Sequence, residues 1–154
     1  MTCTGVLFND ILLIGDEVWK MERFEKFISN LEVLKRAKYE DLNNEFIISG
    51  IIVKFFLQFE LSWKVLKELL RYEGKSIANS GSPREIIKAA YTIYDYLDEE
   101  IWLEMLRARN DMTHIYNGEA AKQMVSLILK RYIPAFVVME EKIRKDYGEI
   151  LKDL

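Results

Sequence analysis

The sequence predicts an all-α protein, an antiparallel up-and-down four-helix bundle with one additional short helix. Three observations predict this fold: apolar side chains recur every three or four residues, helix-start signals separate these stretches, and the pattern of alternating strands and helices is missing. The chain has 154 residues, of which 50% are hydrophobic and only two are proline. A chain of this length buries roughly 70% of the surface that it exposes when unfolded, so one domain can hold a core without disulfides or a structural metal.

Charge and composition exclude several classes of protein. With 22 Lys+Arg against 25 Asp+Glu, the net charge is −3, which excludes a broadly cationic nucleic-acid coat but leaves room for a local basic cleft. The single cysteine, Cys3, cannot form an internal disulfide, which suits a reducing cytosol. The apolar run Ile51–Leu61 is interrupted by polar residues and is too short to cross a membrane. No positive charge precedes Lys20, so a secretory signal is not expected, and we expect a cytoplasmic protein.

Residues 1–20 are expected to form an N-terminal extension rather than part of the domain. Two short apolar runs, Val6–Phe8 and Ile11–Ile14, could pair as a hairpin or lie as an extended arm, and neither is a domain. The codons of Asp16–Val18 can match a bacterial ribosome-binding site just upstream of Met21. We therefore expect Met21 to be the natural start, and residues 21–154 to form a single domain.

The first two predicted helices have clear apolar faces. The first runs from Glu22 to about Ala37, and its apolar face comprises Phe24, Phe27, Ile28, Leu31 and Leu34. After a polar break at residues 41–44, the longest helical pattern runs to about Tyr72, and Gly74 ends it. Its apolar residues alternate steps of four and three, as in a seam between nearly parallel helices. They are Ile52, Phe56, Phe59, Trp63, Leu66 and Leu70.

A short third helix is predicted over Pro83–Ile93. Ser82 supplies a hydroxyl N-cap and Glu85 the matching carboxylate of a capping box. The residues expected to face inward are Ile86, Ile87 and Ala90.

The last two helices complete the bundle. The fourth starts with acidic residues 98–100, where the helix dipole favours negative charge, and its pattern fades near Tyr116. Its expected apolar side comprises Ile101, Trp102, Met105 and Leu106. The fifth runs from Glu119 to about Tyr147, with a kink at Pro134.

The most informative stretch is residues 107–117, which contains the only histidine, His114. On an ideal helix Asn110 and His114 share a face and Arg107 lies a further turn back, whereas Arg109 is about 140° away from His114. Arg109 and His114 therefore converge only if the helix end distorts or a second subunit contributes. Imidazole moves protons near neutral pH and guanidinium holds phosphate, so the two residues suit phosphodiester cleavage.

Simpler interpretations stay open for the same residues. His114 can merely favour the C-terminal end of a helix dipole, with the arginines in surface ion pairs with Asp111 or Glu104. One histidine and one cysteine are too few for a typical zinc site, so no metal or other cofactor is expected, and Cys3 with His114 is a weak nucleophile pair.

Aromatic and basic residues on the helices also have a structural interpretation. Trp63, Trp102 and the other aromatic residues at helical spacing are expected to pack in the core rather than stack on bases. The basic stripe formed by Lys64, Lys67 and Arg71 is explained equally well by a solvated helix face.

Four sequence blocks in order resemble the nucleotidyltransferase substrate-binding protein family of the HEPN superfamily. They are Phe59–Leu66, Ser82–Glu85, Trp102 and the Arg-x4-His-x-Tyr element of Arg109, His114 and Tyr116. The resemblance covers about residues 22–147. Thr113 stands where serine is expected in much of the family, and both side chains carry a hydroxyl.

The resemblance implies a homodimeric helical bundle that works beside a small nucleotidyltransferase encoded by a neighbouring gene, as in toxin–antitoxin pairs. In related HEPN proteins the Arg and His act in a metal-independent endoribonuclease, and two copies of the motif face each other across the dimer. Carried over, Arg109 would bind the scissile phosphate of RNA and His114 would assist proton transfer involving the 2′-hydroxyl. Asn110 matches a supporting polar position, with Thr113 and Arg107 beside it.

The same resemblance leaves a second function open. In some pairs the nucleotidyltransferase adds AMP to the motif tyrosine, here Tyr116, and silences the toxin. The alternative is a non-catalytic substrate-binding subunit whose chemistry lies entirely in the nucleotidyltransferase, because function resides in the site and not in the fold.

Overall fold

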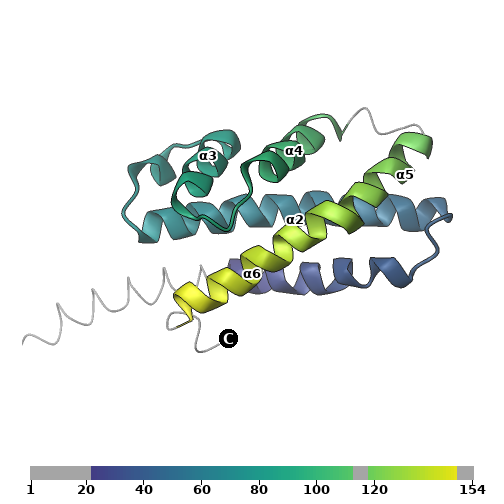
Figure 1. Ribbon diagram of the computed structural model, residues 1–154, viewed down its shortest axis with the longest axis horizontal. Coiled ribbons are helices and arrows are strands. Elements are labelled where there is room, and N and C mark those ends of the chain that lie inside the picture. Colours follow the sequence, from purple (N-terminus) through teal and green to yellow (C-terminus); the bar gives the residue numbers. More distant parts are fainter. Residues whose placement is uncertain (1–21, 113–117, 149–154) are drawn as a thin grey trace, which may run out of the picture.

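The computed structural model describes residues 22–112 and 118–148, and every regular element in these ranges is helical (Figure 1). The all-α class predicted from the sequence is therefore confirmed. The first helix covers residues 22–35 and is followed by the 3₁₀ turn η1 (Ala37–Tyr39). The other elements are α2 (Glu45–Tyr72), η2 (Ser76–Asn79), α3 (Pro83–Ile93), α4 (Glu99–Asn110), α5 (Gly118–Leu127), the π-helical turn η4 (Ile128–Tyr132) and α6 (Ile133–Tyr147).

The helix α2 is the centre of the bundle. The first helix runs antiparallel beside it, α3 and α4 pack along another side, and α5 with α6 crosses it diagonally (Figure 1). Asn44 caps its start, because the Asn44 side chain accepts hydrogen bonds from the backbone N–H groups of Phe46 and Ile47. Gly74 follows its end with a φ of 75°, a left-handed conformation that glycine adopts without steric cost.

The apolar faces expected for the first, third and fourth helices lie in the core. In the first helix Phe24, Phe27, Leu31 and Leu34 are buried and Ile28 is partly buried. Ser82 and Glu85 form the predicted capping box at the start of α3. The three residues expected to face inward from α3 are buried, and so are Trp102, Met105 and Leu106 of α4.

The seam predicted for α2 is wrong in part. Phe56 and Trp63 are only partly buried, whereas Phe55, Gln58 and Ser62 are completely buried. The buried face is rotated towards these residues, and the polar side chains on it have hydrogen-bond partners. Ser62 Oγ, for example, donates to the Gln58 carbonyl at 2.6 Å.

A buried amide pair joins the first helix to α2. Asn30 Nδ2 donates to Gln58 Oε1 at 2.8 Å and to the Lys54 carbonyl at 2.9 Å, and Gln58 Nε2 donates to the Phe27 carbonyl at 3.1 Å. By length and composition alone α2 could cross a membrane, a test that core helices of soluble bundles also pass. Its inward face carries buried Gln58 and Glu68, which are satisfied inside the bundle.

The helix α4 ends at Asn110, earlier than the end predicted near Tyr116. Its last hydrogen bond runs from the Asp111 N–H to the Arg107 carbonyl. Beyond Leu106 none of the residues up to 112 is buried, so packing no longer compensates for the poor helix propensity of Asn110 and Asp111.

The last predicted helix is interrupted next to Pro134, where the sequence predicts a kink. Pro134 lacks an N–H and its ring crowds the carbonyl four residues earlier, and the π-helical turn η4 lies directly before it. The turn places Arg131 and Tyr132 against the same residue of α4. Arg131 Nη2 lies 3.0 Å from Glu104 Oε2, and Tyr132 Oη donates to Glu104 Oε1 at 2.9 Å.

Candidate functional site

The best-defined group at the candidate site is Arg109, in the last turn of α4. Its Nε donates to Glu60 Oε1 of α2 at 2.8 Å, and its Nη1 donates to Asn110 Oδ1 at 3.2 Å. The side chains of Arg109 and Glu60 are 34% and 30% exposed, so the pair lies at the surface. Among the described residues, no acceptor meets the Nη2 group of Arg109. The guanidinium is therefore oriented through two of its nitrogens, Nε by Glu60 and Nη1 by Asn110.

Glu60 is itself fixed by its own helix. Its Oε2 accepts a hydrogen bond from Trp63 Nε1 at 2.9 Å, so each carboxylate oxygen has a defined partner. Lys64 Nζ lies 5.8 Å from the centre of the Trp63 ring, within range of a cation–π contact. Trp63 thus supports the site from the edge of the core.

Glu60 lies within the block Phe59–Leu66, and its position in the sequence alone indicates no role for it. The contact that defines its role spans 49 residues and two helices, so helical spacing alone could not find it. The sequence contained one indication of this pair. Two of the four blocks that resemble the family carry opposite charges, Glu60 in Phe59–Leu66 and Arg109 in the Arg-x4-His-x-Tyr element. The ion pair of Arg109 is with Glu60, and not with Asp111 or Glu104 as the simpler interpretation expected.

Arg107 lies on a different side of α4 from Arg109. Two residues apart on a helix, their side chains diverge by roughly 200°. Arg107 lines a hollow of about 460 Å³ together with Asp98, Glu99, Glu100 and Leu103. The acidic lining of this hollow repels phosphate, and the structure does not bring Arg107 to the guanidinium of Arg109.

The other predicted site residues lie outside the described part of the chain. These residues are Thr113, His114 and Tyr116, and Cys3 and Met21 also lie outside it. The expectation that Asn110 and His114 share one helical face assumed an unbroken helix. Because α4 ends at Asn110, that geometric argument does not reach His114.

Basic and aromatic residues away from Arg109 have structural roles. Arg71 Nη1 lies 3.1 Å from Glu68 Oε1, so the stripe of Lys64, Lys67 and Arg71 is partly neutralised. Trp102 is 1% exposed and packs edge-on against Phe136. Within residues 22–112 and 118–148, no group of three or more His, Cys, Asp or Glu side chains could hold a metal ion.

Comparison with known proteins identifies the family. The model of the family described as nucleotidyltransferase substrate binding protein like matches residues 19–145. The chain belongs to this family, whose name implies association with a nucleotidyltransferase. No curated protein gives a significant match to the chain. The matched range contains both Glu60 and Arg109, and it extends from before the first helix into α6.

Proposed function

We propose that the protein is the HEPN component of a two-component nucleotidyltransferase and HEPN toxin–antitoxin pair. In this proposal it is a cytoplasmic, homodimeric, metal-independent endoribonuclease that its partner nucleotidyltransferase inhibits. The observation that carries the proposal is Arg109, a surface guanidinium in the last turn of α4 that Glu60 holds at Nε and Asn110 holds at Nη1. The helical fold and the family match are consistent with a HEPN protein.

The residues have distinct roles in the proposed reaction. Arg109 binds the scissile phosphate and stabilises the charge that develops on it. His114 assists proton transfer involving the RNA 2′-hydroxyl, a role that suits histidine because an unperturbed imidazole changes charge near neutral pH. Asn110 holds the Nη1 edge of Arg109, and Thr113 supplies a further hydroxyl near the motif. Tyr116 is the residue that the nucleotidyltransferase would modify with AMP.

The test is cleavage of total cellular RNA by the purified protein in EDTA. His114→Ala and Arg109→Ala should each lower the cleavage rate by about a hundredfold or more, because each removes a group that acts in the transition state. Arg84→Ala is the matched control, since Arg84 is an exposed arginine of another helix, and its rate should equal that of the wild type. Circular dichroism and molar mass check that all variants are folded and assembled alike.

Two results would contradict the nuclease. One is cleavage that survives in His114→Ala, which would indicate a contaminating enzyme. The other is no cleavage by wild-type protein whose intact mass shows that Tyr116 carries no AMP. The second result would favour the non-catalytic substrate-binding subunit, for which nucleotide binding without RNA cleavage is the expected behaviour.

A further inference from the structure

An aromatic side chain, Trp63, lies directly beside Arg109. Trp63 Nε1 and Arg109 Nε donate to the two oxygens of the same Glu60 carboxylate, at 2.9 Å and 2.8 Å. These two nitrogens are therefore at most about 8 Å apart. Trp63 is only partly buried, so part of its indole is open to solvent. A base that flanks a phosphate on Arg109 is thus within reach of the indole.

A lysine covers the indole on the same side of α2. Lys64 Nζ lies over the Trp63 ring, 5.8 Å from its centre. Its stem is flexible, so the ammonium can leave the ring when a base stacks there. Glu60, Trp63, Lys64 and Lys67 are three, four and seven positions apart, which places all four within roughly 100° on the helix. We call this set the Trp63 face, and it borders α4 at Arg109.

The Trp63 face carries an excess of positive charge. Its carboxylate, Glu60, is paired with Arg109 at 2.8 Å. Lys64 and Lys67 are partly exposed, and neither forms an ion pair within residues 22–112 and 118–148. At the end of α4 the exposed Asp111 lies two residues after Arg109, so their side chains diverge by roughly 200°. A phosphate at this face therefore meets cations whose charge no neighbouring carboxylate offsets.

Beyond Lys64 the charged surface continues onto the first helix. Lys64 borders a hollow of about 200 Å³, whose other charged residues are Glu22, Arg23 and Lys26. Glu22 is paired with Lys26 at 3.1 Å, which offsets its negative charge. The surface from Arg109 to this hollow thus has cations at both ends and an indole between them. Cations along a backbone path with an aromatic ring for the bases are typical of proteins that bind single-stranded nucleic acid.

We propose that Trp63 and Lys64 form a nucleotide subsite for single-stranded RNA beside the scissile phosphate. A base next to the phosphate on Arg109 stacks on the Trp63 indole, and Lys64 moves from the ring to the adjoining phosphate. Stacking requires a base that is not paired inside a helix, so the subsite selects single strands over duplexes. This inference rests on the proposed function and deepens it, because it states how that site holds its substrate.

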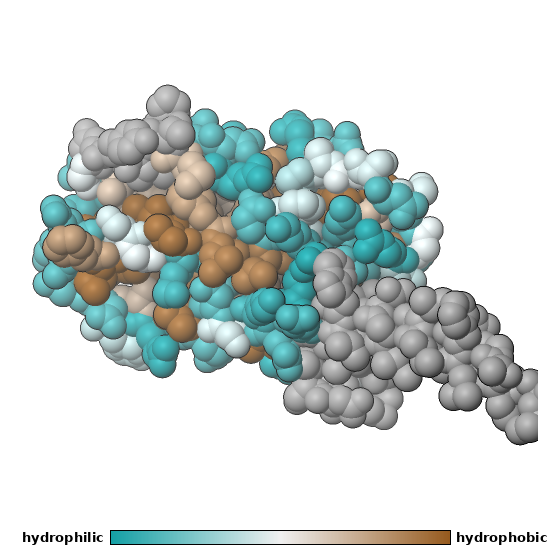
Figure 2. Space-filling model, turned by 180° about the vertical axis from the view of Figure 1, so that it is seen from behind, coloured by the Kyte–Doolittle hydropathy of each residue, from teal (hydrophilic) through white to brown (hydrophobic). Residues whose placement is uncertain are grey.

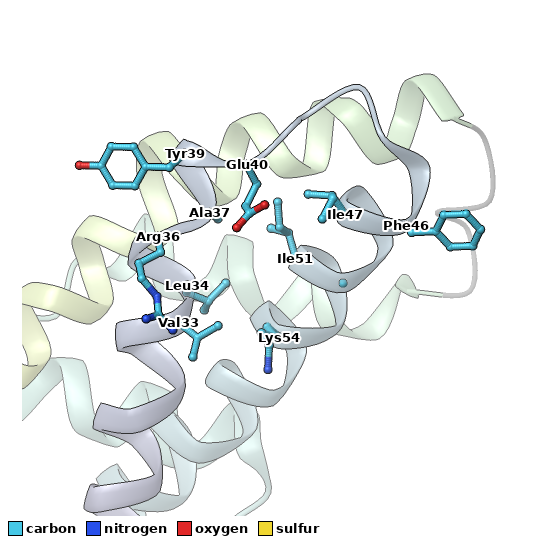
Figure 3. Close-up of a pocket in the computed structure, with 11 residues that line it drawn as sticks. Val33, Leu34, Arg36, Ala37, Tyr39, Glu40, Phe46, Ile47, Ile51 and Lys54 are labelled. Atoms are coloured by element: carbon cyan, nitrogen blue, oxygen red, sulfur yellow. The ribbon is translucent and has the colours of Figure 1, made fainter.

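Exposed apolar side chains alone do not define such a subsite. Figure 2 shows hydrophobic residues in a band across the face of the molecule seen from behind. Tyr39 is 79% exposed and points away from the pocket shown in Figure 3, and Lys38 Nζ lies 5.1 Å from the centre of its ring. In the described part of the chain, however, no carboxylate links Tyr39 to an arginine as Glu60 links Trp63 to Arg109. Lys38 and Tyr39 are therefore a matched control.

The test is the affinity of the full chain for a short labelled single-stranded RNA, measured by fluorescence anisotropy in EDTA. The parent protein carries His114→Ala, so that the RNA stays intact. Trp63→Leu should weaken binding by about fivefold or more, the low end of what stacking on one base contributes. Trp63→Phe keeps a ring but loses the hydrogen bond to Glu60, so it should bind much more tightly than Trp63→Leu. The same RNA annealed to its complement should bind Trp63→Leu and the parent equally.

Lys64→Ala tests the phosphate contact. It should weaken binding and lower the slope of log Kd against log salt concentration by about 0.7, as expected for one phosphate of a single strand. Lys64 lies at the surface of α2, so this variant tests the subsite even where Trp63→Leu does not fold. Lys38→Ala and Tyr39→Leu should leave the affinity and the slope unchanged.

Two results would overturn the subsite. One is unchanged affinity in both Trp63→Leu and Lys64→Ala, which leaves the nuclease in place if the wild-type protein cleaves RNA in EDTA. The other is an equal loss in Trp63→Phe and Trp63→Leu, which would assign the effect to the hydrogen bond with Glu60. Binding that depends on both Trp63 and Lys64, in a protein that cleaves no RNA, would support the subsite and contradict the nuclease.

Discussion

The guanidinium of Arg109 and the carboxylate of Glu60 are joined by a 2.8 Å hydrogen bond between Nε and Oε1. The contact ties the end of α4 to the middle of α2 across 49 residues of sequence. It links two of the four sequence blocks that resemble the family, and it orients the residue that the proposed reaction needs at the phosphate. Glu60 is therefore a positioning residue in the proposed site.

Glu60→Ala should lower RNA cleavage far more than it lowers stability. The pair is about one-third exposed, and such surface ion pairs contribute at most about 1 kcal/mol to the free energy of unfolding. Loss of orientation at a catalytic group can cost roughly tenfold to a hundredfold in rate. Initial cleavage rates and urea unfolding of the same preparations measure the two effects.

Glu32→Ala is the control for Glu60→Ala. Glu32 forms a 2.6 Å ion pair with Lys35 on the first helix, away from Arg109. Its removal should leave the cleavage rate unchanged. Equal rates for Glu60→Ala and wild type would show that Arg109 needs no carboxylate to orient it.

Much of the helical core could be predicted from the sequence, because its apolar side chains follow the period of the helix. The start of α3 was equally predictable, since Ser82 and Glu85 act within one turn of each other. The buried face of α2 was harder to predict. Gln58 is polar and completely buried, and its burial depends on partners in another helix that spacing does not reveal.

The candidate site was predictable only in part for the same physical reason. Arg109 and Asn110 are adjacent in the sequence, and in the structure Arg109 Nη1 donates to Asn110 Oδ1. The contact with Glu60 depends on how α4 packs against α2, and the extrapolation to His114 depended on a helix that ends at Asn110. Long-range packing and helix ends are set by tertiary contacts, which override local propensity.

Gln58→Ala should destabilise the fold by about 2–3 kcal/mol. The substitution leaves Asn30 Nδ2 without one acceptor and the Phe27 carbonyl without its side-chain donor inside the core. Equilibrium urea unfolding measures the change. Gln123→Ala, at an exposed glutamine of α5, should change the free energy of unfolding by less than about 0.5 kcal/mol. A similar small change for Gln58→Ala would mean that the buried amides contribute little net stability.

The protein should lose stability as the pH rises above about 10. Tyr147 Oη donates to Glu73 Oε1 at 2.9 Å and lies 3.0 Å from Tyr94 Oη. Burial, together with the hydrogen bonds to Tyr94 and Glu73, raises the pKa of Tyr147 well above its ordinary value of 10.0. A raised pKa means that the folded state keeps the proton while the unfolded state loses it. The stabilisation is therefore complete below pH 10 and is lost as the pH rises towards the folded pKa.

Urea midpoints measured between pH 8 and 11.5 test this behaviour. Tyr147→Phe removes one titrating hydroxyl, so the decline above pH 10 should become shallower. Tyr39→Phe, at a side chain that is 79% exposed, should leave the decline unchanged. If Tyr147→Phe declines as steeply as the wild type, the hydroxyl of Tyr147 does not contribute to the pH dependence.

Glu104→Ala should cost about 2 kcal/mol of stability, whereas Glu100→Ala on the same helix should cost less than about 0.5 kcal/mol. Glu104 accepts from Tyr132, which is 1% exposed, and from Arg131, so its loss leaves a buried hydroxyl without its acceptor. Glu100 lies 3.9 Å from the same guanidinium and its side chain is 83% exposed, which makes it a matched control. Urea unfolding of both variants measures the difference. Both glutamates lie near Arg131, but only Glu104 accepts a hydrogen bond from Tyr132. Equal losses of stability in the two variants would therefore show that the hydrogen bond to Tyr132 contributes nothing and that packing alone holds the π-helical turn.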